Sequence, residues 1–232
     1  NLFADKVEMN LVNKDIKSAK DQNTQSYIVN NGIKDESLKN TKKDKVFTFI
    51  FISNFFKSKG IETLLQAILL LNKQKFSKRF KVKIIGNFTN QFGKKDLDHF
   101  LHQNKIFNNV NFLGSLYGKE KFKHLSRSHV MIYPTKDDCF PICLLEAMSC
   151  GLPIISTYEG AIPDMIKNNH NGILIKNLKL SIIASAMKFY INKSKIVNLH
   201  SKNNKNDFKK KYNINIFEKN LTNVLIKSLM SN

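Results

Sequence analysis

Residues 129–155, HVMIYPTKDDCFPICLLEAMSCGLPII, predict a strand, a loop, a helix, a turn and a second strand in succession. Residues 129–133 form a short apolar run with β-branched residues, which is typical of a buried strand. We place Pro141 at the first position of a helix, where its missing N–H costs nothing. A mostly apolar helix is expected over residues 142–150, with Gly151 as its C-cap.

Two carboxylates in this stretch call for an explanation. Glu146 lies inside the apolar helix, and Asp138 lies in the loop before it. A carboxylate in a helix suited to burial needs polar partners, because its ionisation is otherwise costly. The start of the helix offers free N–H groups to a phosphate, and both carboxylates could accept hydrogen bonds from ligand hydroxyls. These features favour a nucleotide-sugar site; alternatively, Glu146 caps a neighbouring backbone segment and Asp138 belongs to a solvated turn.

The same stretch resembles a known family. Residues 138–146 are similar to the acidic signature, two carboxylates separated by seven residues, of the retaining glycosyltransferases of the GT-B fold, in particular family 4. The surrounding FPICLLEAMSCGLPII resembles that family's phenylalanine-proline start, glutamate-alanine-methionine core and glycine-leucine-proline exit. Because other stretches match in the expected order, the likeness covers nearly the whole chain. It implies a Rossmann-like α/β fold, an open, mainly parallel sheet with helices on both faces, which is one half of a GT-B fold.

The resemblance also implies a division of the chain. Residues 1–24 resemble the segment where the family's first domain hands over to the second, so we expect a tail end of the N-terminal domain or an interdomain lead-in. Residues 25–232 are expected to form the C-terminal nucleotide-sugar-binding domain, including a final helix over residues 214–229. The missing N-terminal domain would then be supplied in cis or in trans.

Alternating apolar patterns predict the remaining elements of a parallel sheet. Strands are expected at residues 26–33, 46–53, 81–86, 110–113, 154–157 and 173–175. Helices are expected at residues 61–72, 91–105, 119–128 and 178–191, with one more opening at residues 159–161. Residues 34–45 predict a mobile polar loop, and residues 202–211 are strongly basic.

The loop at residues 54–60 follows a buried strand, and in parallel sheets ligands bind at the carboxyl ends of strands. Lys59 resembles the family's lysine that meets the donor diphosphate; the alternative is a solvated loop lysine. Where the family has glycine-arginine, this chain has Ser53-Asn54, so Asn54 brings a hydrogen-bond donor without a charge. Lys57 is a candidate stand-in for the absent cation.

The resemblance assigns further residues to the donor site. Gly86 belongs to a glycine-bearing turn after the next strand, and Leu116 lies in the loop whose backbone reads the nucleotide base in the family. Phe140 belongs to the central motif, and the backbone N–H groups near Ile142 and Cys143 would complete the seat for phosphate.

The implied reaction transfers a sugar from a nucleotide-sugar donor to a hydroxyl of a saccharide or lipid-linked acceptor, with retention of configuration. Lys59 would hold the diphosphate, Asp138 the hydroxyls of the donor sugar, and Glu146 the ribose. In place of the usual glutamate, Asp138 is one methylene shorter. No metal or other cofactor is implied, because cations and a helix N-terminus neutralise the leaving diphosphate.

Composition and the N-terminal segment indicate the cellular compartment in which the protein is expected. No run approaches the roughly 20 apolar residues of a membrane span, and NLFADKVEMN at the start does not read as a signal peptide. The three cysteines, an odd number within one motif, do not suggest a disulfide framework and complete no metal site with histidines. We therefore expect a cytoplasmic chain, with possible peripheral contact at the inner face of the membrane.

The formal net charge of +20 leaves several partners open. Anionic lipid is one, since lysines near such a surface contribute about 1 kcal/mol each. Nucleic acid is not expected, because the basic residues are scattered and the chain uses lysine freely throughout. A noncatalytic nucleotide- or partner-binding module of the same fold is the main alternative, favoured by the Ser53-Asn54 and Asp138 departures.

Overall fold

The computed structural model describes residues 2–3 and 26–230 of the chain. Six strands form one sheet in the spatial order β5-β4-β3-β6-β7-β8, and every pairing in it is parallel. The strands are β3 (Phe47–Ile52), β4 (Phe80–Ile85), β5 (Val110–Phe112), β6 (Val130–Tyr133), β7 (Ile154–Thr157) and β8 (Gly172–Ile175). The predicted open parallel α/β sheet is confirmed.

The order of the strands reverses in the middle of the sheet. From β3 the chain builds outward through β4 to β5, then returns to the other side of β3 and builds outward from β6 to β8. The two halves meet where Phe49 pairs with Val130 and Ile50 with Met131. At such a switch point the loops after neighbouring strands diverge, and the crevice they leave is where open α/β sheets bind ligands.

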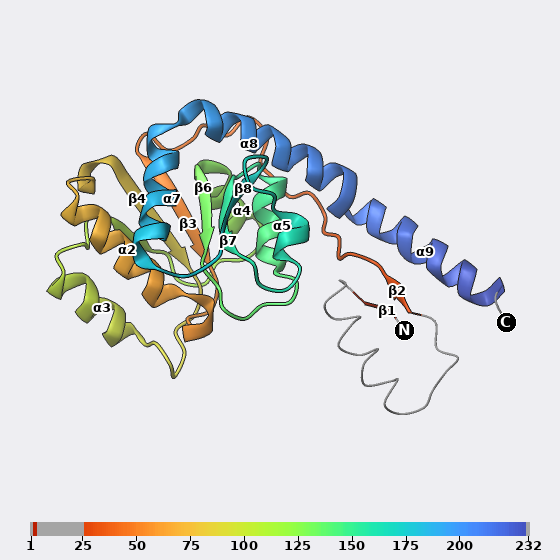
Figure 1. Cartoon of the computed structure of the whole chain (residues 1–232), viewed down its shortest axis with the longest axis horizontal. Helices are drawn as coiled ribbons and strands as arrows, with labels where there is room; N and C mark the ends of the chain where they lie inside the picture. The colour runs from red at the N-terminus through yellow and green to blue at the C-terminus, as the bar shows by residue number, and fades with distance from the viewer. Residues whose placement is uncertain (1, 4–25, 231–232) are drawn as a thin grey trace.

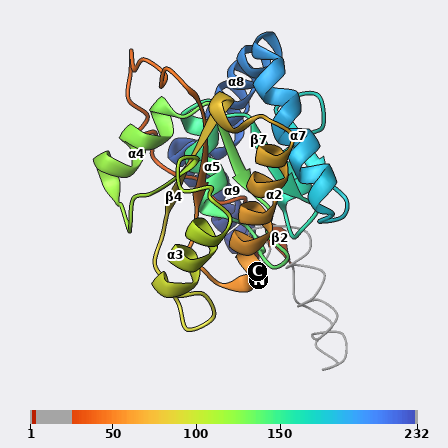
Figure 2. The same cartoon turned by 90° about the vertical axis from the view of Figure 1, so that its left-hand side faces the viewer.

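Helices cover both faces of the sheet. Figure 2 shows α4 on one side of the strands and α2 with α7 on the other. The helices described are α2 (Ile61–Lys73), α3 (Lys94–Gln103), α4 (Gly118–Arg127), α5 (Ile142–Ser149), α6 (Ile162–Met165), α7 (Leu180–Asn192), α8 (Ser194–Asp207) and α9 (Ile214–Met230). Shorter turns are η1 (Lys57–Lys59), η2 (Ser77–Arg79) and η3 (Phe208–Tyr212).

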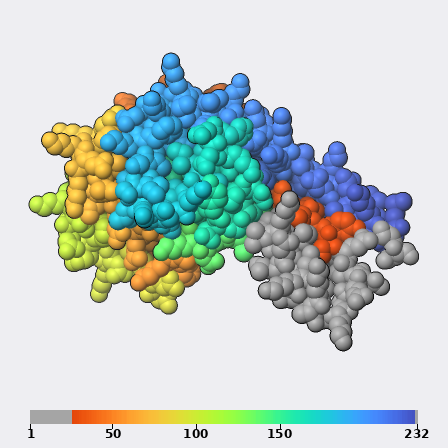
Figure 3. Space-filling model, viewed as in Figure 1, coloured from red at the N-terminus to blue at the C-terminus, as the bar shows by residue number. Residues whose placement is uncertain are grey.

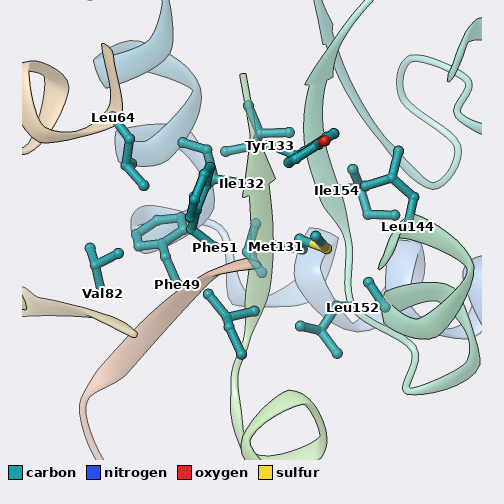
Figure 4. Packing of buried hydrophobic residues seen from close by; sticks show 14 of the residues in the cluster. Phe49, Phe51, Leu64, Val82, Met131, Ile132, Tyr133, Leu144, Leu152 and Ile154 are labelled. Carbon is teal, nitrogen blue, oxygen red and sulfur yellow. The ribbon is translucent and has the colours of Figure 1, made fainter. Parts of the chain in front are cut away.

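The hydrophobic core lies between the central strands and the helices. Phe49 and Phe51 of β3 pack close to Ile132 of β6 and Leu64 of α2 (Figure 4), and all four are fully buried. Burying side chains of this size stabilises the fold by about 1.5–3 kcal/mol each. The helical spacing of the apolar residues in α2 is confirmed, because its buried residues are Ile61, Leu64, Leu65, Ala67, Ile68 and Leu71.

The final helix, α9, extends away from the sheet (Figure 1), and none of its residues is buried. The segment that includes β2 (Tyr27–Ile28) runs beside it (Figure 3). Ile33 forms a parallel bridge with Asn213, just before the helix. The predicted domain boundary at residues 24 and 25 lies outside the described residues, although β1 (Leu2–Phe3) pairs in parallel with β2.

Some predicted bounds were wrong. Only Tyr27–Ile28 of the strand expected at residues 26–33 is a strand, since the rest runs as irregular chain toward Asn213. The helix expected from residue 91 begins at Lys94, because an antiparallel bridge between Thr89 and Phe92 turns the chain first.

The termini of α5 also differ in detail from the prediction. Pro141 is the N-cap, with an extended backbone, and Ile142 is the first helical residue. Cys150 is the C-cap, and Gly151 follows it with φ of +68°. The strongly basic stretch at residues 202–211 belongs to helix α8 and to η3, which the sequence had not predicted as helical.

The loop at residues 34–45 is tied to the domain, contrary to the expected mobility. Lys43 Nζ donates to the Ser128 carbonyl at 2.5 Å, and Leu38 N donates to Ser126 Oγ at 3.2 Å. Asp44 pairs with Lys83 on β4. Composition could not reveal this, because each polar partner comes from an element distant in sequence.

Candidate functional site

Two adjoining cavities lie at the carboxyl ends of the central strands. The larger, here called the α5 cavity, has a volume of about 430 Å³ and is lined by six predicted site residues: Lys59, Asp138, Phe140, Ile142, Cys143 and Glu146. The smaller, here called the β4–β5 cavity, has a volume of about 160 Å³ and is lined by the other three: Asn54, Gly86 and Leu116. Both are also lined by Ile52, Ser53 and Lys121. The structure therefore brings all nine residues to the switch point of the sheet.

An ion pair joins the loops that follow β3 and β6. Lys59 Nζ lies 2.8 Å from Asp138 Oδ2 and also donates to the Asp137 carbonyl at 2.5 Å. Their side chains are 23% and 16% exposed, so the pair is shielded from water but reachable from the cavity. Such a shielded pair is screened less by salt than a surface pair.

The backbone fixes these two loops against each other. The Ser58 carbonyl accepts a hydrogen bond from Lys136 N at 2.7 Å. Gly60, which follows Lys59, has φ of +84°, and a Cβ there would lie 2.1 Å from the Pro134 carbonyl oxygen. Only glycine fits this close approach, and the approach is what places Lys59 beside Asp138.

Tyr133, at the end of β6, fixes the position of the Asp138 side chain by a hydrogen bond. Its hydroxyl donates to Asp138 Oδ2 at 2.6 Å. Burial, together with the nearby Cys143 and Asp138, raises the pKa of Tyr133, so the phenol stays protonated and remains a donor. Both bonds to Asp138 end on Oδ2, which leaves Oδ1 to a ligand. This role could not be predicted from the sequence, because Tyr133 belongs to an apolar run that is typical of a buried strand.

Glu146 has the polar partner that its apolar helix required. Lys121 Nζ, from the first turn of α4, lies 2.5 Å from Glu146 Oε1. Their side chains are 17% and 12% exposed. The alternative that Glu146 caps a backbone segment finds no support, because in the described part of the chain its carboxylate accepts a hydrogen bond from Lys121. Sequence reasoning missed Lys121, whose partner is on another helix.

The start of α5 faces the α5 cavity through Pro141, Ile142 and Cys143. Pro141 provides no side-chain cap, and the first turn contains no acidic residue. The first N–H groups of the helix and its partial positive charge are therefore available to an anion. Burial and the neighbouring carboxylates of Glu146 and Asp138 raise the pKa of the Cys143 thiol, so it lines the cavity as a neutral group.

The β4–β5 cavity depends on a second close approach of two loops. Gly86 has φ of +153°, and a Cβ there would lie 1.8 Å from the Ser53 carbonyl oxygen. Asn54 Oδ1 accepts from Asn87 N at 3.1 Å, so Asn54 joins the loops after β3 and β4. Lys57, the suggested stand-in cation, is exposed and lines neither cavity.

A third cavity, of about 480 Å³, lies at the opposite, amino ends of the strands and is lined by Asp44, Lys45, Lys81 and Lys83 among others. Burial raises the pKa of Asp44, but hydrogen bonds from Lys83 and Arg127 outweigh it and leave that pKa below the ordinary value. Although it is larger, this cavity lies away from the switch point. We therefore assign the candidate site to the carboxyl ends.

Neither a metal cluster nor a membrane span is found in the described part of the chain. No three His, Cys, Asp or Glu residues among residues 2–3 and 26–230 gather closely enough to hold a metal ion. None of the helices in those ranges combines the length and hydrophobicity that crossing a bilayer requires.

Comparison with known proteins gives consistent results. A family model described as glycosyl transferases group 1 matches residues 32–209. An uncharacterized glycosyltransferase of Methanocaldococcus jannaschii is 25% identical over 205 residues, which are 87% of this chain and 54% of that protein. The chain therefore spans about half the length of this relative.

Two solved structures share the fold. The HepE protein of Anabaena, in complex with UDP, superposes with a TM-score of 0.83 at 14% identity, over 97% of this chain and 63% of that one. The C-terminal domain of a glycosyl transferase group 1 family protein from Francisella tularensis superposes with a TM-score of 0.66 at 23% identity. That match covers 75% of this chain and 89% of the domain.

Proposed function

The chain belongs to the glycosyl transferases group 1 family, and we propose that it is the C-terminal, donor-binding domain of a retaining GT-B glycosyltransferase of family 4. One observation carries the proposal. Two lysine–carboxylate pairs, Lys59–Asp138 and Lys121–Glu146, line the α5 cavity. The first residues of α5, which have no side-chain cap, line the same cavity. This arrangement offers positive charge to a diphosphate and carboxylate oxygens to the hydroxyls on either side of it.

In the proposed complex the diphosphate of the nucleotide-sugar lies at the N–H groups of Ile142 and Cys143. Lys59 neutralises the charge that develops on the diphosphate as the bond to the sugar breaks. Fixed cations and a helix N-terminus inside a shielded cavity stabilise such charge without reorganising. This account uses no metal ion, and each of its charged groups belongs to the chain.

Asp138 would orient the donor sugar. Lys59 and Tyr133 fix Oδ2 of its carboxylate, so Oδ1 can accept a hydrogen bond from a sugar hydroxyl. Because the aspartate is one methylene shorter than the glutamate that the family resemblance implies, the sugar must lie closer to the β6–α5 loop. Glu146, held through Oε1, would accept from the ribose with Oε2.

The acceptor, a saccharide or a lipid-linked saccharide, would be bound mainly by an N-terminal domain supplied in cis or in trans. The outer part of α9 suits contact with such a domain, since its exposed apolar side chains include Leu225, Ile226, Leu229 and Met230. We place the reaction in the cytoplasm. The charge of +20 favours peripheral contact with anionic lipid at the inner face of the membrane.

The first test is a calorimetric titration of the purified chain with UDP, GDP and ADP at moderate salt. UDP is the first choice because the HepE structure contains it. We expect one of the three to bind and both Lys59→Ala and Glu146→Ala to weaken it. If the folded chain binds none of them, the proposed donor site is wrong for this chain.

A noncatalytic binding module of the same fold is the second candidate, because Ser53-Asn54 supplies no cation where the family resemblance implies one. The two candidates differ in their use of the sugar. A module would bind the bare nucleotide as well as the nucleotide-sugar, and Asp138→Asn would leave both affinities unchanged.

A further inference from the structure

Lys121 occupies a position between the two cavities of the candidate site. It lines both the α5 cavity and the β4–β5 cavity, whereas Lys59 lines only the α5 cavity. Building on the proposed function, we propose that Lys121 binds the phosphate next to the nucleoside and that Lys59 binds the phosphate next to the sugar. The two lysines would thus divide the diphosphate between them.

The ammonium of Lys121 is held in place before any ligand arrives. Its Nζ lies 2.5 Å from Glu146 Oε1 and 5.8 Å from the centre of the Phe122 ring. Because the side chain is only 17% exposed, it has little freedom left to lose. A pre-ordered cation costs less entropy on binding than a mobile surface lysine would.

Lys121 also keeps hydrogen-bonding capacity for a ligand. An ammonium group has three N–H donors. Among the described residues, Lys121 Nζ donates to Glu146 Oε1, so two donors remain. Lys59 Nζ donates to Asp138 Oδ2 and to the Asp137 carbonyl, so one remains. Lys121 is therefore the better equipped of the two to hold a phosphate.

The balance of charge in the α5 cavity depends on Lys121. The lining residues include two cations, Lys59 and Lys121, and two carboxylates, Asp138 and Glu146. Without Lys121 the carboxylates would outnumber the cations, and the cavity would repel a diphosphate. The loop after β3 offers no replacement, because Asn54 is uncharged and Lys57 lines neither cavity.

The positions of Lys121 and Lys59 along the two cavities determine which phosphate each lysine would bind. The β4–β5 cavity, with Gly86 and Leu116, is where the base would lie, and Asp138 marks the sugar end of the α5 cavity. Lys121 is common to both cavities, and Lys59 is paired to Asp138. A nucleoside monophosphate, which has only the phosphate next to the nucleoside, should therefore depend on Lys121 far more than on Lys59.

The test compares uridine, UMP and UDP, or the same series with the base that binds, by NMR titration of the chain. We expect Lys121→Met to weaken both UMP and UDP by about tenfold to a hundredfold, the value of a charged hydrogen bond. Lys59→Met should weaken UDP by a similar factor and UMP much less. Lys123→Met is the matched control, because Lys123 lies on the same helix, is 49% exposed and pairs with Glu120 at 3.4 Å.

Four further results decide between explanations. If Lys121 only positions Glu146, Lys121→Met would weaken uridine, UMP and UDP by one common factor, which would overturn the proposal. Unchanged UMP affinity in a folded Lys121→Met chain would also overturn it. Lys121→Arg, which keeps the charge, should retain UMP binding and so supports the proposal if it does. A wild-type chain that binds none of these ligands would refute the proposed function itself, and this inference with it.

Discussion

Lys59 Nζ lies 2.8 Å from Asp138 Oδ2, so the loops after β3 and β6 meet through a shielded ion pair. These strands are neighbours in the sheet, although β4 and β5 lie between them in the sequence. The pair therefore marks the switch point of the sheet.

Asp138→Asn should separate recognition of the sugar from recognition of the nucleotide. The change removes the charge of the carboxylate, so affinity for a nucleotide-sugar should fall by about tenfold to a hundredfold. UDP lacks the donor sugar and should bind at least as well, because Lys59 no longer pairs with a charged carboxylate. Calorimetry with UDP and UDP-glucose measures both affinities. Asp137→Asn, on the exposed neighbour, is the control, and equal losses for both ligands would contradict the assignment.

Tyr133→Phe should weaken binding of the donor sugar, because the Asp138 carboxylate is then less firmly positioned. The variant keeps the buried ring but loses the 2.6 Å bond to Asp138 Oδ2. Losing a hydrogen bond to a charged group costs about 1.5–3 kcal/mol. We expect lower affinity for UDP-glucose and a smaller effect on UDP, measured by the same titrations. Should UDP lose as much affinity as UDP-glucose, Tyr133 would support the cavity in general and not Asp138 in particular.

Gly160→Ala should disturb the loop that carries Asp138. A Cβ at this position would lie 2.2 Å from the Asp138 carbonyl oxygen and 2.3 Å from that of Cys139. Gly114→Ala is the matched control, because Gly114 also has positive φ but no atom within 4 Å of its Cβ. Both variants carry the cost of a left-handed backbone, about 1 kcal/mol. Thermal unfolding should show a clearly larger loss of stability for Gly160→Ala than for Gly114→Ala. Equal losses of stability would show that the loop around Asp138 moves aside at no cost.

His129 should make the fold less stable in acid. Burial, with Lys43 nearby, lowers the pKa of His129 to about 4, and its Nδ1 accepts from Thr48 N at 3.0 Å. An unfolded histidine has a pKa of about 6.5. Between these values the unfolded chain binds more protons, so the free energy of unfolding falls as the pH falls from 6.5 to 4.

The variant His129→Asn tests this directly, because asparagine retains an acceptor but does not titrate. Its free energy of unfolding, measured by urea denaturation at several pH values, should fall less steeply than that of the wild type across this window. Parallel curves for the two proteins would show that His129 does not titrate differently on unfolding.

Much of the site could be predicted because its residues follow strands whose apolar pattern is strong. The run at Phe47–Ile52 and the central motif identify neighbouring strands, and ligands of a parallel sheet gather where such strands end. Lys59 and Asp138 thus came together as expected from the family resemblance.

The role of Lys121 and the existence of helix α8 could not be predicted, and the physical reason is the same for both. Lys121 pairs with Glu146 on another helix, so no local spacing in the sequence links the two. In α8 the buried residues include His200 and Asn204, and Asn204 donates to the Leu152 and Asn171 carbonyls. Polar side chains that are buried by distant partners leave no apolar periodicity to detect.

The most direct test of the central claim is a crystal structure of the chain with bound UDP. Our account predicts the diphosphate at the N–H groups of Ile142 and Cys143, with Lys59 and Lys121 within hydrogen-bond distance of its oxygens. UDP bound instead in the cavity of Lys45, Lys81 and Lys83, at the amino ends of the strands, would contradict it.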